Sequence, residues 1–468
     1  MAAPSIASLV ILLRFIGLFQ GWEWAVFDQY MRLRPSESTD ERVVIVGLTE
    51  DDVKAIGQSV VSAHPYADLL EKLRSQSPRA IGLDIYRDLP VEPGHTALTD
   101  LFNTTPYLVG IQKVVGRPGI DTVAPPPALA AKSQVSANDL IVDGDNTVRR
   151  GLLSVQDHNG NTVYGLALYL ALLYLDPEGI RPETIEGETW QLGQATFSPL
   201  QANDGGYIRT DASGYQQLIN YRDSKQTFET VSFSDVLNNR LPPNWATDKI
   251  VLIGAIGESF KDTFYTPYRS QNLLSLPTLT PGVEIHANLT SQIISAALEH
   301  RAMIRSQSET TEYGWILLWA TLGALSIWLW SPTGPQLKQR WQRIGFFSSA
   351  IAAIPLSTFL PFLHGYWIPA VPALLAFAGS ATAVTIYLAY TATNIRRTFG
   401  RYLSQEIVTA LLENPEGQKL GGERRKITLL TSDLRGFTAT SERLPPEQVI
   451  KVLNFYLGHM AEVITRYN

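Results

Sequence analysis

The sequence predicts an α/β domain built around a mainly parallel sheet, followed by an α-helical membrane region. Between Asp28 and Glu312, short apolar runs that end in acids or glycines alternate with stretches of helical periodicity. Beyond Glu312 the chain becomes almost free of charge for long stretches. A chain of 468 residues is also long enough for more than one folding unit.

Three charge-free stretches follow the α/β region, each long enough to cross the hydrocarbon as a helix of about 20 residues. They are residues 313–331, 344–363 and 365–395. Residues 6–27 form a weaker fourth stretch, because Arg14 and Glu23 interrupt it. The alternative for this stretch is a cleaved signal peptide, but it lacks an initial positive charge and a small-residue cleavage site. We therefore expect an uncleaved first anchor and four spans in all.

The short loops indicate the orientation of these spans, since lysine and arginine stay in the cytoplasm. Residues 332–343 carry Lys338, Arg340 and Arg343 without an acid, and Arg396 and Arg397 follow the last span. The link at residues 364–365 carries no lysine or arginine. This pattern predicts that both termini are cytoplasmic and that residues 28–312 lie outside.

The charge balance differs between the outer domain and the rest of the chain. Residues 28–312 have a net charge of −12 and the remaining residues have +6, which together give −6 for the whole chain. An acidic outer domain argues against nucleic acid as a partner. The chain has no cysteine, which excludes a disulfide framework and a thiolate metal site.

The elements of the outer domain follow from its apolar runs. The run at residues 43–48 and those in "PRAIGLDIYRDLP", "PYLVGIQKVV" and "DKIVLIGAIGESFKDTFYTPY" suit strands buried on both faces of a sheet. Helices are expected at residues 66–74 and from near Val283. Ligands of open α/β sheets bind at the carboxyl ends of the strands. The candidate sensor residues at those ends are Asp84, Gly254, Gly257 and Glu258.

Each of these candidates has a more ordinary interpretation, which we favour. Glycines after a strand usually make the turn, and an aspartate there usually caps a backbone amide. The outer histidines show no metal-ligand spacing, so no metal is expected there. Arg149 and Arg150 in "GDNTVRRGLL" follow a tight turn and suit either an anion site or, as we prefer, a solvated hairpin end.

Six segments, in order, resemble the second class of CHASE domains, which are extracellular sensors of bacterial receptors. They span about residues 15–305 and include "RFIGLFQGWEWAVFDQYMRLRPSESTDERVVIVGLTEDDV", "AIGLDIYRD", "DGDNTVRRGLL", "INYR", "KIVLIGAIGESFKDTFYTPY" and "PGVEIHANLTSQII". The resemblance implies a multi-pass receptor of the bacterial inner membrane with an unknown extracytoplasmic stimulus. A histidine kinase output is set aside, because His459 lacks the Glu-Leu-Arg-Thr-Pro sequel.

The cytoplasmic end contains a lone carboxylate at a turn. We expect a short helix at residues 407–412 capped by Ser404, a glycine link, and a strand at residues 427–431. Asp433 follows that strand and precedes Gly436. Such a carboxylate and turn suit a metal-bound phosphate, although an ordinary Asx cap has the same pattern. A helix from Pro446 has an apolar face at Val449, Leu453, Tyr456, Met460, Val463 and Tyr467.

The segment "LLTSDLRGFTATSERLPPEQVIKVLNFYLGHMAEVI" resembles the start of class III adenylate and guanylate cyclase catalytic domains, which have an α+β ferredoxin-like fold. The resemblance implies that Asp433 binds two Mg²⁺ or Mn²⁺ ions, with the Leu434 carbonyl on one. It also implies a phosphate site and a homodimer, and it favours ATP over GTP. The phosphate-binding residues are then Arg435, Gly436, Phe437 and Thr438.

The family's second metal-binding aspartate and its transition-state asparagine and arginine fall beyond Asn468, so we expect the chain alone to be inactive. The expected function is a receptor that controls cyclic nucleotide synthesis, with cAMP favoured over cGMP. The alternative is a non-enzymatic regulator that dimerises with an intact cyclase, or a decayed remnant. The expected parts are an anchor (1–27), a sensor (28–312), three membrane helices (313–395), a linker (396–425) and a cyclase start (426–468).

Overall fold

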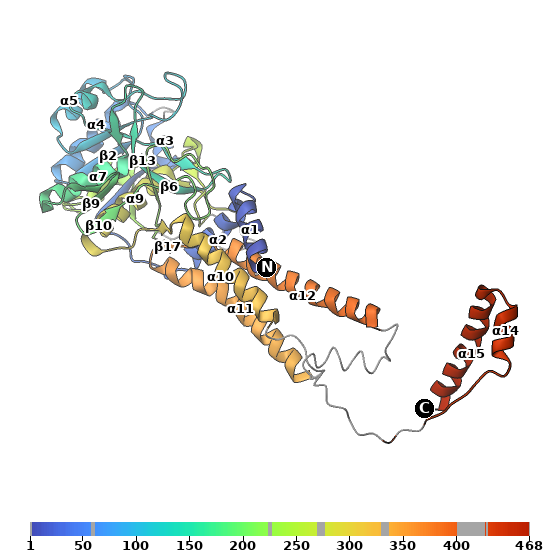
Figure 1. Cartoon of the computed structure of the whole chain (residues 1–468). Coiled ribbons are helices and arrows are strands. Elements are labelled where there is room, and N and C mark those ends of the chain that lie inside the picture. Colours follow the sequence, from blue (N-terminus) through green and yellow to red (C-terminus); the bar gives the residue numbers. More distant parts are fainter. Residues whose placement is uncertain are drawn as a thin grey trace. The chain divides into compact units, whose positions relative to one another are not determined.

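The computed structural model describes residues 2–57, 61–222, 227–268, 277–328, 337–399, 426 and 429–467 (Figure 1). It divides into two compact units, residues 1–404 and residues 405–468. The first unit holds the α/β domain and the apolar helices, and the described residues of the second include two helices. Each unit is described by itself.

A six-stranded sheet forms the centre of the α/β domain, in the order β12-β1-β13-β2-β3-β4. All five neighbouring pairs are parallel, which confirms the predicted parallel sheet. The expected runs form β1, β2, β3 and β13. The strands are β1 (Val43–Leu48), β2 (Ala80–Asp84), β3 (Leu108–Gln112), β4 (Val135–Ala137), β12 (Glu229–Ser232) and β13 (Ile250–Ala255).

Helices cover both faces of this sheet. Side chains alternate along a strand, so Val43 and Ile45 join one core whereas Val44 and Val46 join the other. The first core contains residues of α2 (Gln20–Leu33), α7 (Leu166–Leu175) and α9 (Gly282–Glu299). The second is covered by α3 (Glu50–Ile56), α4 (Ala63–Ser75), α5 (His95–Thr104), α6 (Pro127–Ala130) and α8 (Phe233–Leu237).

Short antiparallel strands complete the outer domain. A second sheet runs in the order β11-β6-β5, with β7 also on β6, and a third in the order β10-β9-β8. Two further strands, β14 and β15, pair with each other. The strands are β5 (Ile141–Val142), β6 (Val148–Gln156), β7 (Thr162–Tyr164), β8 (Pro182–Glu186), β9 (Thr189–Leu192), β10 (Ala195–Phe197), β11 (Tyr215–Leu218), β14 (Thr263–Phe264) and β15 (Thr280–Pro281), with 3₁₀ turns η1 (Asp176–Glu178) and η2 (Glu258–Phe260).

The expected first anchor is not one straight helix. It forms α1 (Ala2–Phe15) and α2, which meet at 87°. Gly17 lies in the break with φ of 84°, a left-handed conformation that favours glycine. Helix α2 continues past the expected boundary at residue 27 and ends at Leu33, because its Trp24, Phe27, Tyr30 and Met31 belong to the outer domain's core.

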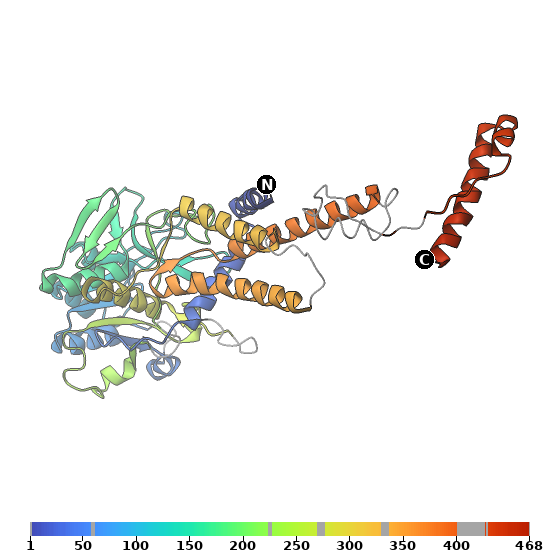
Figure 2. The ribbon, with the colours of Figure 1, turned by 60° about the horizontal axis from the view of Figure 1, so that its bottom comes forward.

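Three further apolar helices follow, α10 (Glu309–Trp328), α11 (Leu337–Leu363) and α12 (Val371–Phe399). In both ribbon views they extend from the same side of the outer domain (Figures 1 and 2). By length and composition, two segments suit a membrane span, Gly345–Leu363 and Val371–Asn394, and the bent pair α1–α2 is a third if it counts as one. Helix α10, as far as it is described, is not among them. The four-span topology stays a prediction.

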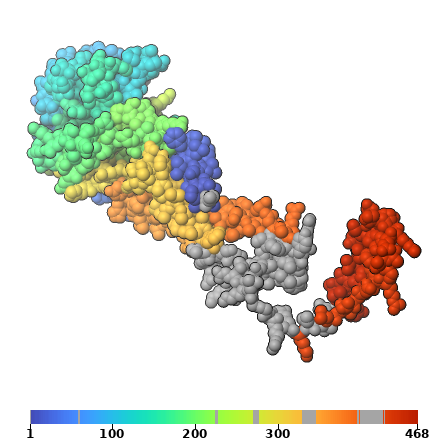
Figure 3. Space-filling model, in the orientation of Figure 1, coloured from blue at the N-terminus to red at the C-terminus, as the bar shows by residue number. Residues whose placement is uncertain are grey.

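Helix α1 packs against α10 and α12, and Figure 3 shows the blue α1 against the yellow α10. Arg14 on α1 forms a buried ion pair with Glu312 on α10. Further along, β16 (Arg305–Ser306) pairs in parallel with β17 (Tyr366–Trp367). The segment that follows α11 therefore lies beside the end of the outer domain.

The second unit contains α14 (Phe437–Arg443) and α15 (Pro446–Tyr467). The helix expected from Pro446 is confirmed. The strand expected at residues 427–431 is wrong for residues 429–431, which have no regular structure; a strand needs a hydrogen-bonded neighbour, and none lies beside them among residues 429–467. Residues 427–428, Ser404 and the helix expected at 407–412 lie outside the described residues.

Candidate functional site

A cavity of about 650 Å³ lies at the carboxyl edge of the central sheet, where sequence reasoning places a ligand of an α/β domain. It is bounded by the ends of β1, β2 and β13, the segment after β4, the turn after η2 and the start of α9. Its polar lining side chains are Tyr66, Asp84, Tyr86, Lys113, Asn138, Asp139, Lys261, Asp262 and His286.

Asp84 is the last residue of β2 and lies deep in this cavity. It pairs with Gly254 across the sheet and is 7 % exposed. Its carboxylate accepts one long hydrogen bond, 3.4 Å from Asn138 Nδ2. The backbone cap that we favoured for Asp84 is wrong, because no backbone amide within the described ranges donates to it. Burial raises the pKa of Asp84 to about 7.

Asp262 and His286 approach the cavity from the other side. Asp262 lies beside the first residue of α9, since a Cβ on Gly282 would stand 2.8 Å from Asp262 Oδ2. Burial and the charge of Asp84 raise the pKa of Asp262 to about 6. His286, on α9, is 4 % exposed, and burial lowers its pKa to about 4. The imidazole is therefore neutral at neutral pH.

Asn138 orders the polar wall between these groups. Its Oδ1 accepts a hydrogen bond of 2.8 Å from Tyr86 Oη, which turns its Nδ2 toward Asp84. The neighbouring Asp139 accepts from the amides of Val114 and Val115 at 2.8 and 3.0 Å. Asp139 is therefore satisfied by the backbone, whereas Asp84 is not.

The other three sequence candidates lie beside the cavity rather than in its lining. A Cβ on Gly254 would stand 2.5 Å from Val283 Cβ, so glycine there lets α9 approach β13. A Cβ on Gly257 would stand 2.8 Å from Glu50 Oε1. Glu258 is exposed. The glycines thus serve the turn and the packing, which agrees with their more ordinary interpretation.

Sequence reasoning missed Asp262, Asp139 and Asn138, and it considered His286 only as a metal ligand. No group of three His, Asp or Glu side chains in the described part of the chain is arranged to hold a metal ion. One signal was available in the sequence: Asp262 follows β13 and His286 follows the next helix start, and both positions map to the same sheet edge as Asp84.

Arg149 and Arg150 contradict the expectation of a solvated hairpin end. Both are buried, and Arg149 is 0 % exposed. Arg149 pairs with Asp28 on α2 at 2.7 Å, with Asp143 at 2.9 Å and with Asp145 at 2.7 Å. Arg150 pairs with Asp143 at 2.8 Å. Because internal carboxylates occupy both guanidinium groups, the anion interpretation has no support.

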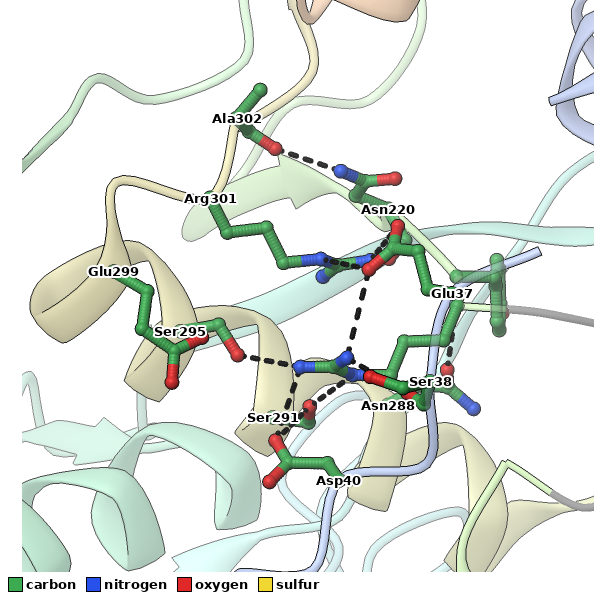
Figure 4. A network of polar contacts seen from close by, with 12 residues as sticks. Glu37, Ser38, Asp40, Asn220, Asn288, Ser291, Ser295, Glu299, Arg301 and Ala302 are labelled. Atoms are coloured by element: carbon green, nitrogen blue, oxygen red, sulfur yellow. Dashed lines mark hydrogen bonds and ion pairs between the residues drawn. The ribbon is translucent and has the colours of Figure 1, made fainter. Parts of the chain in front are cut away.

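A second buried arginine network fastens the entry segment of the domain to α9 (Figure 4). Arg222 lies 3.2 Å from Asp40 and donates to Ser291 and Ser295 of α9 at 2.7 and 2.6 Å. Arg301 pairs with Glu37 at 2.7 Å. These contacts are internal, so we assign the network to architecture rather than to ligand binding.

The candidate metal site in the second unit is a single exposed turn. Gly436, with φ of 76°, directly precedes α14 as its N-cap residue, and the Phe437 amide donates to the Leu434 carbonyl at 3.1 Å. Asp433, Arg435 and Thr438 are exposed. Within residues 429–467 no group of three His, Asp or Glu side chains is arranged around Asp433 to hold a metal ion.

Comparisons with known proteins identify a family match that covers the outer domain. A family model described as "CHASE2 domain" matches residues 5–325. The uncharacterized protein Rv1318c of Mycobacterium tuberculosis and the uncharacterized protein Mb1352c of Mycobacterium bovis are each 31 % identical over 74 residues, 16 % of this chain. The chain spans only 13 % of the length of these curated relatives. No solved structure matches it.

Proposed function

Because the chain belongs to the CHASE2 domain family, an extracellular sensor domain found in signalling receptors, we propose that it is the sensing part of a receptor that controls cyclic nucleotide synthesis. The stimulus acts on the outer domain. The output is a class III cyclase domain that begins at residue 426 and acts as a homodimer.

One observation carries this proposal: a single helix, α2, touches both the sensor and the start of α12. Glu23 on α2 accepts hydrogen bonds from the amides of Val371 and Ala370 at 2.6 and 3.4 Å. Asp28, on the same helix, pairs with Arg149 of β6. A displacement of β6 therefore has a packed route to α12, which leads toward the cytoplasmic part.

Aromatic packing reinforces this route. Phe27 on α2 lies 4.8 Å from Trp367 and 5.4 Å from Phe362 between ring centroids. Trp367 also lies 5.8 Å from Tyr207 of the outer domain. Packed cores resist gradual deformation and shift between discrete arrangements. This packing supports a receptor in which sensor and membrane helices move together.

The proposed output rests on the residues around Asp433. A carboxylate at the start of a turn and a left-handed glycine, Gly436, suit a metal-bound triphosphate. In a complete domain Asp433 and the Leu434 carbonyl bind Mg²⁺ or Mn²⁺, and residues 435–438 bind phosphates. Bound there, the metal ions would supply Lewis-acid activation of the ribose 3′-hydroxyl and charge stabilisation of the leaving pyrophosphate, with ATP favoured over GTP as the substrate.

The test uses the receptor with its complete cyclase domain in bacterial membranes. Asp433→Ala removes a metal ligand, so Mn²⁺-dependent cyclic nucleotide formation falls to background while the protein stays in the membrane fraction. Asp433→Asn serves as the isosteric partner and Glu442→Gln as a nearby exposed control. Unchanged activity in Asp433→Ala would favour the non-enzymatic regulator instead.

A further inference from the structure

We propose that the cavity at the sheet edge is a binding site for a small organic cation, an amine with an apolar body, whose ammonium group lies between Asp84 and Asp262. This inference rests on the proposed sensor function and names the chemical class of its stimulus.

Asp84 differs from the other buried aspartates of this domain. Six are buried among the described residues: Asp28, Asp40, Asp52, Asp84, Asp139 and Asp143. Three of them pair with arginine, and two accept backbone amides. Asp84 has neither, although burying an unpaired carboxylate is strongly unfavourable. The group that would neutralise it is not supplied by the described chain.

The charges around Asp84 favour a cation from solution. Asp262 reinforces the negative potential, and the basic group that acts on these two carboxylates is His286, which lowers the pKa of Asp262 electrostatically. Lys113 and Lys261 line the cavity but are exposed to solvent. His286 is neutral at neutral pH, because burial lowers its pKa to about 4. At neutral pH a cation that enters the cavity therefore need not displace a charged side chain of the protein from these carboxylates.

The walls of the cavity suit an amine with an apolar body. Tyr86, Phe260 and Phe264 line the cavity and are accessible to a ligand. Aromatic faces attract ammonium groups by cation–π interaction. Leu48 and Ile111 add aliphatic surface. A volume of about 650 Å³ is also typical of sites for small organic molecules rather than bare ions.

Binding of a cation between two carboxylates of raised pKa has a measurable consequence. Asp84 and Asp262 have pKa values near 7 and 6, raised by burial and, for Asp262, by the charge of Asp84. A bound ammonium group favours the ionised form of both. Proton release therefore accompanies binding at pH 6 to 7, and the apparent binding enthalpy depends on the buffer.

The test is calorimetry on the full chain in detergent, with butylamine and 2-phenylethylamine as probes. The matched neutral and anionic compounds are 1-butanol and butyrate. We expect saturable binding and proton release for the amines alone. Asp84→Asn and Asp262→Asn should each weaken amine binding by about 10- to 100-fold. Glu258→Gln removes an exposed carboxylate outside the cavity and should leave it unchanged.

Several results would overturn the proposal. These are equal binding of 1-butanol, preferential binding of butyrate, no saturable binding of either amine, or wild-type affinity in both asparagine variants. The measurement needs no cyclase output, so it separates the two proposals. If the wild-type protein binds neither amine, the cation site is refuted but the proposed receptor function is not. If Asp433→Ala keeps full cyclase activity, the proposed cyclase output is refuted but the cation site is not.

Discussion

Asp28 on α2 and Arg149 on β6 form a two-pronged ion pair, with Nε and Nη2 of the arginine 2.7 and 2.8 Å from the two carboxylate oxygens. Both side chains are almost completely buried. The pair joins the N-terminal helix pair to the middle of the outer domain. It is the direct polar contact through which β6 and α2 constrain each other.

Replacing Arg149 by alanine should destabilise the protein strongly. Asp28, Asp143 and Asp145 would lose their shared cation, and breaking a buried pair by removing one partner costs about 3 to 5 kcal/mol. Thermal unfolding of the purified full chain measures the loss. Arg181→Ala is the matched control, because its pair with Asp176 is exposed and should contribute under about 1 kcal/mol. Similar losses in both variants would contradict this interpretation of the network.

Replacing Asp84 by asparagine should change how stability depends on pH. The folded pKa of Asp84 is about 7, above its ordinary 3.8, so its favourable contribution is complete below pH 4 and is lost as pH rises through 7. The asparagine amide stays neutral at every pH, so Asp84→Asn should gain on the order of 4 kcal/mol over wild type at pH 8 and almost nothing at pH 4.

Unfolding midpoints of the two proteins between pH 4 and pH 8 measure this difference. Asp139, Asp262 and His286 titrate in both proteins, so the difference reports Asp84 together with its effect on the neighbouring Asp262. A gain of equal size at every pH would show that folding does not shift the pKa of Asp84. Glu258→Gln, in an exposed position, should show no such trend.

Replacing Glu23 by alanine should make the N-terminal end of α12 open more often, because two of its backbone amides lose their hydrogen-bond acceptor. The amides of Val371 and Ala370 would lose their acceptor, and an unsatisfied buried donor costs about 1 to 3 kcal/mol. Hydrogen exchange over residues 366–375 should accelerate by about 10- to 100-fold. Glu23→Gln keeps an acceptor oxygen and should exchange nearly as slowly as wild type. Unaltered exchange in Glu23→Ala would mean that α12 does not depend on α2.

Reporter fusions can test on which side of the membrane each segment of the predicted topology lies. A reporter enzyme that is active only outside the cytoplasm should give signal when fused after Arg305 and none when fused after Arg401. A third fusion, in the lysine- and arginine-bearing segment 332–343, should also be silent. A signal from this third position would show that α10 does not cross the membrane, and it would contradict the four-span arrangement.

Much of the central sheet was predictable because its strands are continuous apolar runs. Val43–Leu48 and Ile250–Ala255 are buried on both faces, and no amphipathic pattern competes with them. Of the antiparallel strands only β6 was expected, after the tight turn in "GDNTVRRGLL", and the others were not predicted. Strand β8 (Pro182–Glu186) is exposed throughout and polar, so its pairing with β9 leaves no periodic signal in the sequence.

The candidate site was predicted only in part. Asp84 could be found because it ends a clear strand, whereas Asp262 and His286 become its neighbours only when α9 packs against β13. Arg149 was misjudged for a related reason. A turn followed by two arginines is usually solvated, and the carboxylate that buries Arg149 comes from Asp28, 121 positions earlier.

Trp367 has a consequence for how this protein is made. Its ring packs on Phe27 and Tyr207, yet it lies beyond α10 and α11 in the chain. The ribosome must therefore synthesise both helices before the outer domain can complete its core. A fragment that stops at Arg305 lacks Phe362 and Trp367, two aromatic rings that pack on Phe27. Soluble fragments of the sensor should include residues 362–367 or a substitute for them.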